Sequence, residues 1–167
     1  DTSKVSQAKR IIRDTQTNKI KVGYKFGLEF FYSKEGRKFI SSLKKQTIFL
    51  DLKLNDIPNT VGSAVKSLKN LNISYLTVHL SSGLSAIKVL KKESKNIKIV
   101  GVTTLTSLNN SDLKEIGYNK KVNELVKHQA KLAKRAKLDA IVCSGHEIRS
   151  VKRVFKKEII TPGIKIY

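Results

Sequence analysis

Hydrophobic residues fall into short, nearly continuous apolar runs separated by longer segments with amphipathic spacing. Continuous apolar runs of this length are typical of strands that are buried on both faces of a parallel sheet. The pattern predicts six strands, over Ile20–Phe26, Thr47–Leu52, Ile73–His79, Ile97–Thr103, Ala140–Cys143 and Glu158–Thr161.

The segments between these runs repeat apolar residues at helical spacing, with lysines and arginines on the opposite face. Serine, asparagine and threonine side chains at their starts can cap helices. The predicted helices run over Ser3–Thr15, from a cap at Ser33 through Leu43, from a cap at Asn59 or Thr60 through Leu68, over Leu84–Leu90, over Val122–Ala136 and over Glu147–Phe155.

The regular alternation of strands and helices predicts an α/β fold built from βα units around a parallel sheet. A complete (β/α)8 barrel usually needs ~250 residues, with ~200 as a lower limit, and the chain has 167. The alternatives are a smaller doubly wound sheet, or a barrel whose first and last strands lie outside this sequence. No repeat, linker or low-complexity tract divides the chain, so residues 1–167 are expected to form a single domain.

The charge is unusual, because 34 Lys and Arg residues against 13 Asp and Glu leave a net charge of +21. Such a balance indicates an anionic partner: nucleic acid, an acidic membrane or a phosphorylated metabolite. However, the lysines are spread from Lys4 to Lys165, and no aromatic residues are interleaved with them. Binding to single-stranded nucleic acid favours such aromatic residues, because bases stack on them. We therefore interpret most of the charge as solvated helix surface.

The apolar runs, the start of the sequence and the cysteine content indicate the cellular compartment. No apolar run reaches the ~18 residues of a membrane span, and the polar start predicts no signal peptide. Cys143 is the single cysteine and cannot form an internal disulfide. These features favour a reducing cytoplasm.

The most informative segment lies where the second predicted strand ends, in Asp51, Lys53 and Asp56. Side chains two positions apart in a strand point to the same face, so Asp51 and Lys53 are expected side by side. In parallel α/β folds, ligands bind at this carboxyl edge. An acid–base–acid array there can hold a proton donor against an anion and repel a substrate carboxylate. The alternative, which the spacing leaves open, is a buried salt bridge that only orients the loop.

The segment DLKLNDIPNT, over Asp51–Thr60, resembles the signature of the orotidine 5'-phosphate decarboxylase family. Other segments resemble successive strands of the same family in the same order. These segments are Lys25–Phe31, Thr77–Gly83, Val100–Ser107, Leu138–Ser144 and Thr161–Ile164.

This resemblance implies a TIM (β/α)8 barrel with its first and last strands outside the sequence. It implies a carbon–carbon lyase of pyrimidine nucleotide biosynthesis that converts orotidine 5'-phosphate to uridine 5'-phosphate without a metal or an organic cofactor. By the family pattern, Lys53 protonates C6 as carbon dioxide leaves. Asp51 crowds the departing carboxylate and holds Lys53, and Lys25 links the charge network to the ribose.

The resemblance also implies substrate contacts and a homodimer. Asp56 and Thr60 are expected to reach into the site of a partner subunit. The remaining substrate-binding residues implied are Asp1 at the ribose, Thr106 near the pyrimidine, Pro162 in the pocket wall, and Lys165. Lys165 stands where the family usually carries arginine, so a point charge replaces a bidentate fork. The family's phosphate loop is expected beyond Tyr167.

Two other functions stay open. One is a magnesium-dependent sugar-phosphate decarboxylase or aldolase of the same barrel suprafamily, which shares the aspartate–lysine–aspartate pattern. The other is a non-catalytic basic protein that binds nucleic acid, although this reading gives no reason for the ordered strand-end motifs. A membrane partner is not expected.

Overall fold

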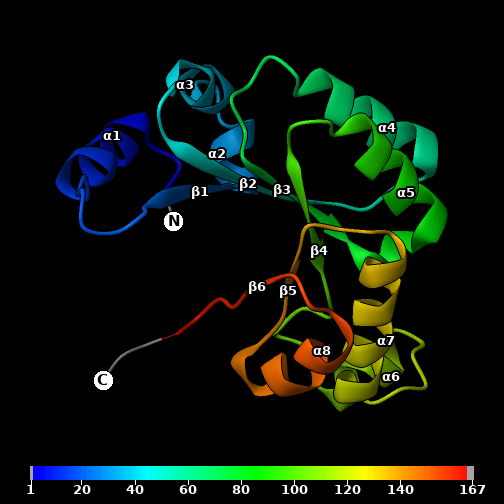
Figure 1. Ribbon diagram of the computed structural model, residues 1–167. Coiled ribbons are helices and arrows are strands. Elements are labelled where there is room, and N and C mark those ends of the chain that lie inside the picture. Colours follow the sequence, from blue (N-terminus) through cyan, green and yellow to red (C-terminus); the bar gives the residue numbers. More distant parts are fainter. Residues whose placement is uncertain (1, 165–167) are drawn as a thin grey trace.

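The computed structural model describes residues 2–164 and contains six parallel strands in one sheet, in the order β1-β2-β3-β4-β5-β6. Figure 1 shows the strands following one another around an arc, with helices along its outer side. The strands are β1 Gly23–Gly27, β2 Thr47–Leu54, β3 Tyr75–His79, β4 Lys98–Val102, β5 Ala140–Val142 and β6 Glu158–Ile160. All six predicted strands therefore form.

The helices connect consecutive strands, as expected for βα units. All six predicted helices are present, with ends that differ by a few residues. The α-helices of residues 2–164 are α1 Val5–Asp14, α2 Leu28–Tyr32, α3 Gly36–Ser42, α4 Pro58–Ser67, α5 Gly83–Glu93, α6 Asn110–Glu115, α7 Val122–Arg135 and α8 Ile148–Val154. None of these helices is both long enough and apolar enough to cross a membrane.

The outer face of the sheet and the inner faces of the helices form the core. Leu50 of β2 and Leu76 of β3 are fully buried, and they belong to one cluster with Val65 of α4 and Ile87 of α5. Removing one such side chain from water contributes about 1.5–3 kcal/mol. This packing holds the strands in place, and with them the side chains at the strand ends.

The other face of the sheet is more open than the apolar runs predicted. Burial on both faces is confirmed for β4, of which only the first residue is exposed. It is wrong for β2, where buried residues alternate with half-buried ones. The half-buried positions of β2 include Phe49, Asp51 and Lys53. The polar side chains of β2 thus share the face that is turned away from the helices.

Several predicted ends need correction. The first strand begins at Gly23, where it starts to pair with Thr47, and Ile20 is 70% exposed. Helix α4 begins at Pro58, with Ile57 as its N-cap in place of Asn59 or Thr60. Proline suits the first helical position, because that N–H has no partner within the helix.

Ser33 has a different role from the predicted one. It follows α2 and donates a hydrogen bond from Oγ to the carbonyl of Phe30 (2.7 Å), whereas Glu35 precedes α3. Two short helices, α2 and α6, were not predicted. Helix α6 begins with a capping box between Asn109 and Asp112, a pattern that is readable in the sequence.

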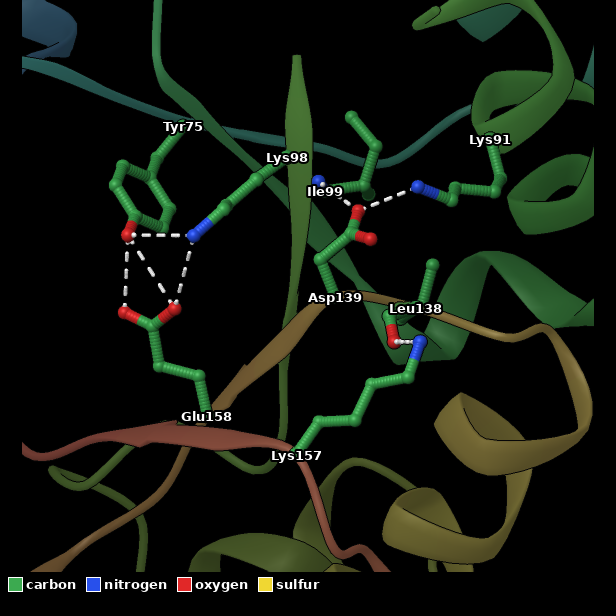
Figure 2. A network of polar contacts seen from close by, with 8 residues as sticks. All are labelled: Tyr75, Lys91, Lys98, Ile99, Leu138, Asp139, Lys157 and Glu158. Carbon is green, nitrogen blue, oxygen red and sulfur yellow. Dashed lines mark hydrogen bonds and ion pairs between the residues drawn. The ribbon is translucent and has the colours of Figure 1, made fainter. Parts of the chain in front are cut away.

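A polar network joins the amino-terminal ends of the strands (Figure 2). Oδ2 of Asp139, just before β5, accepts hydrogen bonds from Nζ of Lys91 in α5 and from the backbone N–H of Ile99 in β4 (2.8 Å). Beside it, Nζ of Lys98 lies 3.5 Å from a carboxylate oxygen of Glu158. One carboxylate therefore ties a helix and two strands together at the edge away from the carboxyl ends.

Candidate active site

A charged cluster lies at the carboxyl ends of β1 and β2. Asp51 and Lys53 come from β2, and Lys25 comes from the neighbouring strand β1, in which Gly27 pairs with Asp51. Oδ2 of Asp51 lies 2.9 Å from Nζ of Lys53 and 3.3 Å from Nζ of Lys25. The predicted meeting of Asp51 and Lys53 is therefore present, and Lys25 joins it from the next strand.

The aspartate is the most enclosed member of the cluster. Its side chain is 12% exposed, compared with 35% for Lys53 and 51% for Lys25. Its second oxygen, Oδ1, accepts a hydrogen bond from Oγ1 of Thr77 in β3 (3.0 Å). Both carboxylate oxygens are thus held, one by two ammonium groups and the other by a hydroxyl.

The surroundings lower the pKa of the Asp51 carboxyl from its ordinary value. Burial acts in the opposite direction and raises it, because a charge is less stable away from water. The hydrogen bond and charge of Lys53, the charge of Lys25 and the hydrogen bond from Thr77 together outweigh burial. Asp51 is therefore an anion at neutral pH, and it offers a fixed negative charge to the two lysines.

The backbone of β2 is irregular where the cluster forms. Leu50 pairs with Leu76 and Leu54 pairs with Val78, so β2 advances four positions while β3 advances two. Within this bulge Lys53 has φ of +47°, a left-handed conformation that is uncommon for residues other than glycine. Asp51 and Lys53 therefore meet through a bulged backbone, and not through the regular pleat on which the prediction was based. Bulges next to active sites commonly re-aim a side chain.

His79 ends β3 beside the cluster. Burial lowers the pKa of its imidazole, and the positive charge of Lys53 lowers it further, while Asp51 acts weakly in the opposite direction. The histidine is therefore neutral at neutral pH and adds no third positive charge at this edge.

A cavity of about 480 Å³ opens beside the cluster. Lys25, Asp51 and Lys53 line one part of it, and Ile12 and Phe26 are among the apolar residues that line another. A cavity of this size that combines an apolar wall with a few charged groups is typical of a small-molecule site.

The two residues expected at a partner's site lie apart from this cluster. Asp56 is exposed in the loop after β2, and its carboxylate accepts a hydrogen bond from the backbone N–H of Ile57 (2.7 Å). Thr60 is exposed on the first turn of α4. Among the described residues, Lys53 forms its ion pair with Asp51 and not with Asp56. The acid–base–acid array is therefore not completed within one chain.

The other predicted substrate residues are more distant or not described. Thr106 is exposed in the turn after β4, and Pro162 is exposed after β6. Both lie on the carboxyl side of the sheet, but neither lines the cavity. Asp1 and Lys165 lie outside the described residues. Thr77 was missed, although a hydroxyl within the apolar run YLTVH was a signal in the sequence. Residues 2–164 contain no group of three His, Cys, Asp or Glu side chains placed to hold a metal ion.

Comparisons with known proteins identify the family of this chain. A sequence model of the orotidine 5'-phosphate decarboxylase / HUMPS family matches residues 1–166. The orotidine 5'-phosphate decarboxylase of Wolbachia pipientis subsp. Culex pipiens is 43% identical over 153 residues, covering 87% of this chain and 67% of that protein. The enzyme of that name from Carboxydothermus hydrogenoformans is 40% identical over 154 residues, covering 85% of this chain and 64% of that protein. The chain thus spans about two thirds of the length of these relatives.

A solved structure has the same fold over nearly the whole chain. The orotidine 5'-phosphate decarboxylase of Lactobacillus acidophilus superposes with a TM-score of 0.86 at 32% identity, covering 99% of this chain and 79% of that one. Consecutive βα units with a charged cluster at the carboxyl ends of the strands define a (β/α)-barrel protein with an enzyme-type site. The chain belongs to the orotidine 5'-phosphate decarboxylase / HUMPS family. The predicted TIM-barrel class is thereby confirmed.

Proposed function

We propose that the protein decarboxylates orotidine 5'-phosphate to uridine 5'-phosphate, with Lys53 as the proton donor. Family membership and the names of the relatives support the reaction. The observation that carries the assignment of Lys53 is its ammonium group, 2.9 Å from the half-buried carboxylate of Asp51 at the edge of a cavity. The reaction needs a cation at this place, because loss of carbon dioxide leaves an electron pair on C6 of the pyrimidine.

Lys53 has two tasks in this proposal. Its positive charge stabilises the negative charge that develops at C6, and a charge fixed in advance costs no reorganisation during the reaction. Its proton then moves from Nζ to C6, which gives uridine 5'-phosphate and a neutral amine. The half-buried position of the side chain supports this role, because the charge is less screened there than in open water.

Asp51 and Lys25 complete the chemistry of the cluster. The anionic Asp51 repels the substrate carboxylate in the ground state and orients Lys53 toward the reacting carbon. That repulsion disappears when the carboxylate leaves as neutral carbon dioxide, so it favours the transition state over bound substrate. Lys25, 3.3 Å from the same aspartate oxygen, carries the charge network to the ribose.

Further contacts follow from the family pattern. Asp56 and Thr60, which are both exposed on this chain, reach the site of a second copy in a homodimer. Thr106 contacts the pyrimidine or its surroundings, Pro162 lines the pocket, and the remaining contacts come from Asp1 and Lys165. The reaction uses no cofactor, and we place it in the cytoplasm.

The deciding experiment is the substitution Lys53→Ala. Turnover is expected to fall by roughly a thousandfold or more, because both charge stabilisation and the proton donor are lost. The measurement is the absorbance change as orotidine 5'-phosphate is consumed, in a protein whose circular dichroism matches the wild type. The matched control is Lys66→Ala on α4, where an exposed lysine pairs with Glu93 far from the cavity. Near-normal turnover by Lys53→Ala would refute the assigned role.

A further inference from the structure

Thr77 contacts both catalytic residues of β2 through one atom. It lies in β3 and is fully buried. Its Oγ1 accepts a hydrogen bond from the backbone N–H of Lys53 (2.7 Å) and donates one to Oδ1 of Asp51 (3.0 Å). The same hydroxyl therefore sets the backbone of one residue and the carboxylate of the other.

The bulge in β2 creates the need for such a contact. Between the pairs Leu50–Leu76 and Leu54–Val78 the ladder is interrupted, and the N–H of Lys53 is directed to a side chain of β3. A buried backbone N–H without a partner is costly, so buried N–H groups are nearly always paired. In place of a carbonyl, the hydroxyl of Thr77 keeps Lys53 in its left-handed conformation, with φ of +47°.

The polarity of the two hydrogen bonds is fixed. A threonine hydroxyl has one proton and two acceptor lone pairs. Because the backbone of Lys53 can only donate to it, the one proton is free for Asp51, and a carboxylate is the matching acceptor. With Oδ1 held in this way, Oδ2 is turned toward Nζ of Lys53 at 2.9 Å. The orientation of the ion pair thus depends on a buried residue that does not line the cavity.

We propose that Thr77 is a positioning residue: its hydroxyl clamps the bulged backbone at Lys53 and the carboxylate of Asp51 in the geometry from which the proton is delivered. The inference rests on the proposed function, since it concerns the same site. It goes beyond the ion pair itself, because the geometry of the pair between Asp51 and Lys53 is assigned to a residue of the neighbouring strand β3.

The test compares Thr77→Val with Thr77→Ser. Valine keeps the shape and removes both hydrogen bonds, whereas serine keeps the hydroxyl. We expect Thr77→Val to lower kcat by about tenfold to a hundredfold, the scale of a misplacement of the order of 1 Å. KM is expected to change by less than about twofold, because the positioning acts in the transition state. Thr77→Ser is expected to recover most of kcat.

Ser74→Ala is the matched control. Oγ of Ser74, just before β3, accepts a hydrogen bond from the backbone N–H of Ile48 in β2 (3.3 Å), the same kind of contact at the other end of this strand pair. Its kcat should equal that of the wild type. If Thr77→Val fails to fold, Thr77→Ala, which removes the hydroxyl without adding a methyl group, takes its place. Unchanged kcat in the variant without the hydroxyl, or an equal loss in Thr77→Ser, overturns the inference.

A second readout separates this inference from the proposed function. Nuclear magnetic resonance follows the exchange of the Lys53 amide proton and the titration of the Asp51 carboxyl, with or without turnover. Thr77→Val should speed the exchange and raise the pKa of Asp51, and Ser74→Ala should change neither. If the wild type is inactive but Thr77→Val still shows both changes relative to it, the proposed reaction is contradicted and the positioning role of Thr77 is supported. If neither the exchange of the Lys53 amide nor the pKa of Asp51 changes in Thr77→Val, the positioning role is overturned, whatever the activity.

Discussion

At the scale of single residues, the cluster works because two cations and one hydroxyl converge on one carboxylate. Lys53, Lys25 and Thr77 all contact Asp51, and together they lower its pKa against the opposing effect of burial. The sequence predicted the charges and their neighbourhood from the spacing in DLKLND. The hydroxyl of Thr77 stands out in its apolar run, but its contact with Asp51 could not be predicted, because strand pairing brings together two residues that are 26 positions apart in the chain.

This lowered pKa links the stability of the fold to pH. A carboxyl whose folded pKa is depressed contributes stability that is fully present above its ordinary pKa, about 3.9, and is lost as pH falls through the folded value. In urea unfolding between about pH 6 and about pH 2, the wild type should lose its stability advantage over Asp51→Asn toward the acid end.

The matched control for this titration is Asp14→Asn, an exposed aspartate that pairs with the adjacent Arg13. Its unfolding free energy should run parallel to that of the wild type across the range. A difference between wild type and Asp51→Asn that stays constant down to the lowest pH would contradict the account of Asp51.

At the scale of elements, local patterns determine where strands and helices lie, and contacts between elements determine their ends. The apolar runs located all six strands, but Ile20–Val22 stays outside β1, because the pairing with β2 begins at Gly23. The bulge in β2 had no signal in the apolar pattern, since the residues on either side of it read as one strand. It depends on the register with β3, which is a property of two segments together.

The polar network around Asp139 gives a prediction at this scale. Asp139→Ala leaves the buried N–H of Ile99 without its partner (2.8 Å) and frees Lys91 of α5. The unfolding free energy should fall by about 1–3 kcal/mol, the cost of an unsatisfied buried donor. Chemical denaturation measures this loss.

Asp14→Ala serves as the comparison for Asp139→Ala, since it removes another ion-paired aspartate, but an exposed one. Exposed pairs contribute about 0–1 kcal/mol, so this variant should stay close to the wild type. Equal effects of the two substitutions would mean that the carboxylate of Asp139 does not tie α5, β4 and β5 together.

At the scale of the whole molecule, the arrangement of the sheet gathers the charged strand ends at one edge and leaves Asp56 outside the cluster. Lys53 pairs with Asp51 in the described chain, while Asp56 is exposed and caps its own loop through Ile57. Our proposal completes the site with Asp56 from a second copy. A site shared between subunits has a consequence that mixing experiments can measure.

Mixing Lys53→Ala with Asp56→Ala, each inactive alone, should restore activity after the subunits exchange. Each mixed dimer then has one site with both defects and one site with neither, so about a quarter of wild-type activity is expected from a random mixture of two-fold dimers. Activity is measured after the mixture has been held under conditions that allow exchange.

The control is a mixture of Lys53→Ala with Asp51→Ala. Both residues belong to the same subunit's cluster, so each mixed dimer carries a defect in both sites and no activity should return. No recovery in the first mixture, with subunit exchange verified by size and mass, would contradict the shared site.

The sequence by itself determined the class of fold and the chemical groups of the site. Apolar periodicity and helix-forming spacing are local properties, and Asp51 and Lys53 are only two positions apart. Tertiary structure alone decided how these groups are aimed. The bulge at Lys53, the buried hydroxyl of Thr77 and the arrival of Lys25 from β1 arise from pairing between strands that are distant in the chain. Pairing register and desolvation depend on which segments meet, and no window of neighbouring residues contains that information.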